Sequence, residues 1–201
     1  MIVGAGVVAL VALAAVVASL TYLHLEPTGL SPVRNAVSQY GITDFKPGYR
    51  AATIAFAIAG IALATALHRE LSGHGAKLVL LLLVLFAIAR AAISWFPMDA
   101  PGTERTSTGS MHGVLAIVAF GGATAAAFRL GSVLSNGPHW HSLGPVSVWL
   151  GCAMLAFLLG MMLSRGLPWL RARFGAIERG FYACAIAWFA VFAVASVASA
   201  H

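Results

Sequence analysis

Three polar residues that could carry out acid–base chemistry stand out in this otherwise apolar chain. Ser38 offers a nucleophilic hydroxyl group, His112 an imidazole that can act as a general base, and Asp99 a carboxylate that can orient this imidazole. The three residues are far apart in the sequence, so only the fold can bring them together. We treat them as the candidate catalytic residues.

Arg90 is the most informative charged residue, because it lies within a long apolar segment. An arginine inside a membrane span costs about 2.5 to 3.5 kcal/mol on insertion scales and therefore needs compensation. We expect an acidic partner on the same side of the membrane, with Asp44, Asp99 and Glu178 as the candidates. The alternative is that the long side chain snorkels to the membrane interface.

The longest polar connection, residues 26–48, predicts a partly ordered cap after the first apolar segment. Within it, the stretch Pro32 to Tyr40 is predicted to form a short helix that begins with the proline. Such a helix would place Arg34, Asn35 and Ser38 along one stripe, since residues three and four apart are neighbours on a helix. The candidate ligand-binding residues expected around this cap are Arg34, Asn35, Arg90, Glu178 and Arg179.

The elements that must position these side chains are membrane-spanning helices. The chain is 60% hydrophobic and 9% charged, whereas ordinary globular domains contain roughly 25% charged residues. Six segments have about the length that a spanning helix needs, at residues 2–23, 49–67, 78–95, 111–128, 146–163 and 181–200. Tyr49, Trp95 and Tyr182 lie near segment ends and are predicted to be interfacial anchors. The predicted fold class is an all-α integral membrane protein, a six-transmembrane-helix bundle that forms one domain over residues 1–201.

The distribution of basic residues predicts the orientation of this bundle. The connections after the first, third and fifth segments lie on one side, and they carry Arg34, Lys46, Arg50, Arg105, Arg165, Arg171, Arg173 and Arg179. The other side carries only Arg69, Lys77 and Arg129. By the positive-inside rule, the polar connections are therefore cytoplasmic.

Several common functions find no support in the sequence. The net charge of +6 comes from scattered residues rather than from a basic helix or an aromatic platform, so no nucleic-acid partner is predicted. His24 and His112 are too few to make a zinc site, which needs three or four ligands, and no metal site is predicted. The sequence contains no dinucleotide fingerprint and no phosphate-binding P-loop, and no cofactor is predicted.

Four short motifs resemble those of a known family. They are Arg34-Asn35-Ala36-Val37-Ser38-Gln39-Tyr40, Phe96-Pro97-Met98-Asp99, His112 and Glu178-Arg179. Their order along nearly the whole chain resembles the prokaryotic six-helix membrane proteins catalogued as domain of unknown function 998. The resemblance implies a prokaryotic cell membrane protein in which Asn35, Ser38, Asp99, His112, Glu178 and Arg179 act as a set, and it supplies no reaction. Members of that family often begin with a basic amino terminus, which implies outward-facing motif loops, whereas this chain begins Met1-Ile2-Val3-Gly4.

Three functions are consistent with these features. The first is an interfacial polar pocket for an amphipathic small molecule or lipid, and a membrane-embedded enzyme would be one form of it. The alternative is a structural or accessory subunit of a membrane protein complex. Transport is less favoured, because only one ionisable residue lies well inside a span and no inverted repeat is visible. The expected partners are membrane lipids, an amphipathic small molecule, and either a second copy of the chain or another protein of a membrane complex.

Overall fold

The computed structural model describes residues 2–71, 73–137 and 140–199, and over these ranges the protein is helical with no strand. The six long helices are α1 (Ile2–Leu25), α2 (Lys46–Glu70), α3 (Gly73–Ala92), α4 (Ser107–Ser135), α5 (Leu143–Leu163) and α7 (Phe174–Ala198). Each contains a stretch that is long and apolar enough to cross a membrane. The predicted six-helix class is therefore confirmed.

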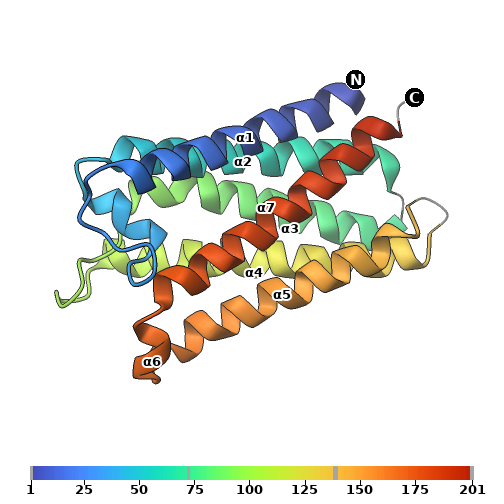
Figure 1. The fold of residues 1–201 in the computed structure, drawn as a ribbon. Coiled ribbons are helices and arrows are strands. Elements are labelled where there is room, and N and C mark those ends of the chain that lie inside the picture. Colours follow the sequence, from blue (N-terminus) through green and yellow to red (C-terminus); the bar gives the residue numbers. More distant parts are fainter. Residues whose placement is uncertain (1, 72, 138–139, 200–201) are drawn as a thin grey trace.

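The long helices form a closed ring in which chain neighbours pack against each other. Contacts join α1 to α2, α2 to α3, α3 to α4 and α4 to α5, and α7 then packs against both α5 and α1. Helix α7 crosses the bundle obliquely between those two helices (Figure 1). Because α7 also contacts α2, it can contribute side chains to the interior of the bundle as well as closing the ring.

The centre of the bundle is packed with aromatic side chains from three helices. The ring centroids of Phe56, Phe86 and Phe189 lie 5.0 to 5.2 Å from one another, a spacing that suits edge-to-face and tilted aromatic pairs. The indole of Trp188 donates a 2.8 Å hydrogen bond to Ser147, whose hydroxyl donates to the Ala127 carbonyl at 2.7 Å. These bonds connect α7, α5 and α4 inside the core.

A small residue allows α2 and α3 to approach closely beside this aromatic centre. A β-carbon placed on Gly60 would lie 3.0 Å from the ring of Phe86 and 3.2 Å from the β-carbon of Ala87. Helices in lipid associate largely through such close van der Waals packing. Larger side chains at Gly60 would therefore push the two helices apart.

The three connections after α1, α3 and α5 gather at one end of the bundle, opposite the start of α1 and the end of α7 (Figure 1). We call this the cap end, made of residues 26–45, 93–106 and 164–173. It contains two short 3₁₀ helices, η1 (Val37–Ile42) and η2 (Ile93–Trp95), and the four-residue helix α6 (Pro168–Arg171). The fold thus collects the polar connections on one side.

The predicted helix from Pro32 to Tyr40 is wrong. The Asn35 side chain accepts a 2.8 Å hydrogen bond from the Ser31 amide, which closes a turn, and Ala36 is extended. The carbonyl groups of Val33 and Asn35 accept hydrogen bonds from α7 instead of from a local helix. Tertiary bonds to α7 have therefore replaced the local helical bonds, and only the shorter helix η1 forms.

Candidate functional site

A cavity of about 270 Å³ lies beneath the cap end. All three cap-end connections contribute to its wall, through Ser38, Met98 and Arg165 among others. Its polar lining consists of Ser38, Tyr49, Arg90, His112, Arg165, Glu178 and Tyr182. Pockets for drug-sized ligands usually measure roughly 300 to 1,000 Å³, so this cavity suits a small ligand or the polar part of a larger one.

Arg90 occupies the cavity wall near the end of α3, and it is only 2% exposed. Its guanidinium carbon lies 5.3 Å from the ring centroid of Tyr182 and 5.7 Å from that of Phe56. The side chain does not snorkel to the surface, because it is held between these rings. Its charge therefore remains inside the protein.

The expected acidic partner of Arg90 is not found at pairing distance. Among the described residues, no carboxylate forms an ion pair with the guanidinium, and the buried Nε has no hydrogen-bond partner. Glu178 lines the same cavity, whereas Asp44 and Asp99 do not. The two aromatic faces supply part of the compensation, because a cation is attracted to the π-face of a ring.

Glu178 is fixed by the cap rather than by Arg90. Its Oε2 accepts a 2.7 Å hydrogen bond from the amide of Val37, and the glutamate is only 4% exposed. The bond joins α7 to the start of η1. It places a carboxyl group in the wall of the same cavity as Arg90. It also gives the buried Val37 amide a hydrogen-bond partner.

His112 presents one free ring nitrogen. Its Nδ1 lies 2.7 Å from the carbonyl oxygen of Phe96, and since a carbonyl group can only accept, Nδ1 carries the hydrogen. In the neutral ring Nε2 is then an acceptor, and it makes no hydrogen bond within the described ranges. The geometry therefore leaves His112 able to accept a proton or a hydrogen bond from a ligand.

Ser38 is held by a weak bond, because its hydroxyl donates to the sulfur of Met98 at 3.1 Å. A thioether is a poor acceptor, so a ligand oxygen could replace it at little cost. Ser38, Arg90, His112 and Glu178 are the candidate site residues that the structure brings together around the cavity.

Asp99 lies outside the cavity lining and stabilises the start of α4. Its Oδ1 accepts a 2.6 Å hydrogen bond from the Thr106 hydroxyl, and its Oδ2 accepts from the Thr106 amide at 3.1 Å. Thr106 in turn caps α4 by accepting from the Gly109 amide at 3.0 Å. These two bonds from Thr106 lower the pKa of Asp99, with a smaller contribution from the charge of Arg105.

Arg34, Asn35 and Arg179 also lie outside the cavity lining. Arg34 is exposed, and Asn35 closes the turn described above. Arg179 donates to His24 at 2.6 Å and to the Asn35 carbonyl at 2.8 Å. It also donates to the Tyr40 hydroxyl at 3.3 Å. Arg179 therefore fastens the cap to α1 and α7.

Tyr49 and Tyr182 line the cavity, and their predicted position at the membrane interface is wrong. They are predicted to be interfacial anchors, but they are only 3% and 4% exposed and face the interior. One signal was available for Tyr182, since it follows Glu178 by four residues and therefore shares its helical stripe. No comparable signal identified Arg165, which lies in the connection after α5.

The described residues contain no group of three or more His, Cys, Asp or Glu side chains that could hold a metal ion. In comparisons with known proteins, a family model described as protein of unknown function (DUF998) matches residues 7–195. No curated protein and no solved structure matches the chain.

Proposed function

Since the chain belongs to the family of proteins of unknown function described as DUF998, and is a multi-pass membrane protein by its six apolar helices, we propose that it binds an amphipathic small molecule or lipid. The polar group of this ligand enters the cavity beneath the cap end. The observation that carries the proposal is the buried Arg90 side chain without an ion-pair partner among the described residues.

A buried guanidinium that forms no ion pair is costly, since the effective penalty for burying an ion is several kcal/mol. Glu178 in the same cavity does not pair with it, because this carboxyl group bonds the Val37 amide. A cation–π contact returns only about 0.5 to 2 kcal/mol. A phosphate or carboxylate group in the cavity would supply the missing compensation, because arginine binds such groups through two parallel hydrogen bonds. The polar group of the proposed ligand is therefore anionic.

The other walls suit the rest of such a ligand. The Nε2 atom of His112 can accept a hydrogen bond, and the Ser38 hydroxyl can donate one. Ile93 and Phe120 supply apolar surface beside these groups. Because the cavity holds only about 270 Å³, we place the apolar tail of the ligand outside it, between the helices.

Catalysis would be an extension of this binding function. His112 would act as the general base and Ser38 as the nucleophile, with the substrate held by Arg90. Asp99 would act on His112 only through its negative charge, since both of its oxygens accept hydrogen bonds from Thr106. A reaction would thus depend on Ser38 and His112, whereas binding alone depends on Arg90.

The proposal predicts that Arg90→Met loses the bound ligand. Losing one charge-assisted contact costs about 1.5 to 3 kcal/mol, so ligand retained through purification should fall by about tenfold or more. Arg90→Lys keeps the charge and should retain an intermediate amount. The measurement is mass spectrometry of small molecules and lipids extracted from the protein after purification in mild detergent.

A matched control is Arg105→Gln, which removes an exposed arginine of the cap end that lies outside the cavity lining. It should retain the wild-type amount of ligand. Equal retention by Arg90→Met and the wild-type protein, with both variants folded by circular dichroism, would contradict the proposal.

A structural or accessory subunit is the second candidate function. The bonds of Glu178 and Arg179 to the cap favour it, because they form a hydrogen-bonded plug at one end of the bundle. Under this alternative, Arg90→Met would copurify with a stoichiometric protein partner just as the wild-type chain does. Purified chain that retains a ligand but no partner would argue against it.

A further inference from the structure

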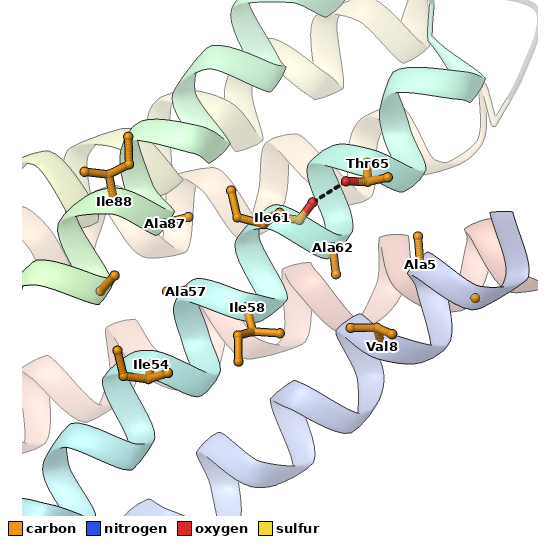
Figure 2. Close-up of a pocket in the computed structure, with 12 residues that line it drawn as sticks. Ala5, Val8, Ile54, Ala57, Ile58, Ile61, Ala62, Thr65, Ala87 and Ile88 are labelled. Atoms are coloured by element: carbon orange, nitrogen blue, oxygen red, sulfur yellow. Dashed lines mark hydrogen bonds between the residues drawn. The ribbon is translucent and has the colours of Figure 1, made fainter. Parts of the chain in front are cut away.

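We propose that the outer face of α2 and α3 binds one anionic phospholipid, independently of the cavity beneath the cap end. Its head group lies in a basic pocket at the start of α2, and one acyl chain lies in an apolar groove along the two helices (Figure 2). None of the candidate site residues lines the pocket or the groove, although Tyr49 of the cavity also lines the basic pocket.

The basic pocket has a volume of about 410 Å³ and is lined mainly by polar groups, among them Lys46, Arg50 and Ser94. Asp44 also lines it, but no ion pair joins this carboxylate to either cation among the described residues. The guanidinium of Arg50 lies 4.9 Å above the ring of Trp95. Two cations therefore face one carboxylate, and the pocket keeps a net positive charge.

Ser94 gives this pocket an unused hydrogen-bonding group. Its Oγ is buried and has no partner in the part of the chain that the structure describes. A buried hydroxyl normally finds a partner, because an unpaired one costs free energy. A phosphate oxygen in the pocket would supply that partner, and Lys46 and Arg50 would neutralise its charge.

The apolar groove has a volume of about 520 Å³ and lies between α1, α2 and α3. Ile58, Ile61 and Ile88 in its wall are each about half exposed. Its one hydroxyl, that of Thr65, is already bonded to the Ile61 carbonyl at 2.8 Å (Figure 2). The groove therefore offers surface only to an apolar chain.

The pocket and the groove share no lining residue, but one helical stripe of α2 connects them. On α2, residues Arg50, Ile54, Ile58, Ile61 and Thr65 follow one another at intervals of three or four, so they form one stripe. From Ile54 to Thr65 this stripe is about 16 Å long at 1.5 Å per residue. A charged group at one end of an extended apolar groove matches the shape of a phospholipid that lies parallel to the helices.

A lipid fits this face better than a second copy of the chain. In a two-fold dimer each surface meets the same surface of its partner, so this face would place basic pockets close to each other. An anionic lipid removes that repulsion, because each Lys or Arg near a membrane surface gains about 1 kcal/mol from anionic lipid. The charge also selects an anionic head group over a zwitterionic one.

The test is native mass spectrometry of the full chain from nanodiscs that contain equal amounts of phosphatidylglycerol and phosphatidylcholine. Besides any ligand held in the cavity, the wild-type protein should retain one further lipid, predominantly phosphatidylglycerol. The double variant Lys46→Gln/Arg50→Gln should lower this preference by about thirtyfold, since each of the two cations contributes about 1 kcal/mol. In a separate variant, Ala91→Trp should block the groove and reduce retention of both lipids.

The matched control is Arg69→Gln/Lys77→Gln, which removes two exposed cations at the other end of α2 and α3 and should keep the wild-type preference. Equal retention of the two lipids by the wild-type protein would overturn the proposal, as would an equal loss in the control, or a protein dimer in place of the lipid-bound monomer. Arg90 is unchanged in all these variants, so failure here leaves the cavity's function untouched.

Discussion

The polar side chains at the cap end and in the helices beside it differ in the hydrogen bonds they make. Glu178, Asp99 and Arg179 are engaged with the protein itself, whereas the Nε of Arg90 and the Nε2 of His112 have no hydrogen-bond partner in the described part of the chain. Groups that the fold leaves unused are the ones available to a ligand. The groups without a partner are therefore the candidates for binding a ligand, and the groups with a partner stabilise the fold.

Asp99 yields a pH-dependent prediction at the level of one residue. Its pKa is lower in the folded protein than in the unfolded chain, because both of its oxygens accept hydrogen bonds from Thr106. The stabilisation from these bonds is therefore fully present above the unfolded pKa of about 3.9, and it is lost as the pH falls through the folded pKa. Asp99→Asn should lower the thermal unfolding midpoint at pH 7.

The difference in unfolding midpoint between Asp99→Asn and the wild-type protein should shrink as the pH is lowered below about 3.9. Thermal scans of both proteins in the same detergent over this range provide the measurement. A difference that stays constant to low pH would mean that the carboxylate charge does not stabilise the start of α4.

At the level of elements, the cap depends on α7. The Val37 residue is buried, and among the described residues its amide donates only to the Glu178 side chain. Glu178→Ala leaves this donor without a partner, which costs about 1 to 3 kcal/mol. Hydrogen exchange of the Val37 amide should accelerate accordingly. Glu178→Gln keeps an acceptor oxygen and should show a smaller effect.

The control for this exchange experiment is Glu104→Ala, an exposed acid in the connection between α3 and α4, and it should leave exchange at Val37 unchanged. If Glu178→Ala and Glu178→Gln accelerate exchange equally, the hydrogen bond does not hold the cap.

The sequence predicted the centres of the long helices better than their ends. Hydropathy located all six spans, because hydrocarbon forces an apolar segment of this length to be helical. It placed the start of the last helix at residue 181, whereas α7 begins at Phe174, since helical hydrogen bonding continues into a polar flank that hydropathy does not mark. The wrong helix at Pro32 to Tyr40 had a different cause, because distant bonds to α7 decided its backbone.

The candidate site was predictable in its location but not in its contacts. Because successive spans cross the membrane in opposite directions, the connections after α1, α3 and α5 lie at one end of the bundle. The cavity lies at this end. Side-chain directions are set by packing, so the sequence could not tell that His112 lines the cavity while Asp99 caps α4. It likewise missed that Tyr49 faces inward.

For the whole molecule, the distribution of basic residues predicts that the cap end faces the cytoplasm. Single cysteines at Thr103, in the connection after α3, and at Ser142, in the connection after α4, can test this after Cys152 and Cys184 are replaced by serine, because both positions are exposed. In intact cells, a membrane-impermeant maleimide should label Ser142→Cys and leave Thr103→Cys unlabelled.

Permeabilised cells supply the control, because both cysteines should then be labelled. The reverse pattern in intact cells would place the cap end outside, and the ligand of the cavity would then be drawn from the outer leaflet of the membrane.

The closure of the ring by α7 has a consequence for biosynthesis. A ribosome makes α7 after α1 to α5, so these five helices exist before the segment that packs between α1 and α5. Until then the Val37 amide lacks its acceptor on Glu178, and the cavity lacks the wall formed by Tyr182. Before α7 is made, Arg90 therefore has only Phe56 of its two aromatic neighbours. A ribosome that stalls before α7 leaves a chain that cannot yet hold a ligand.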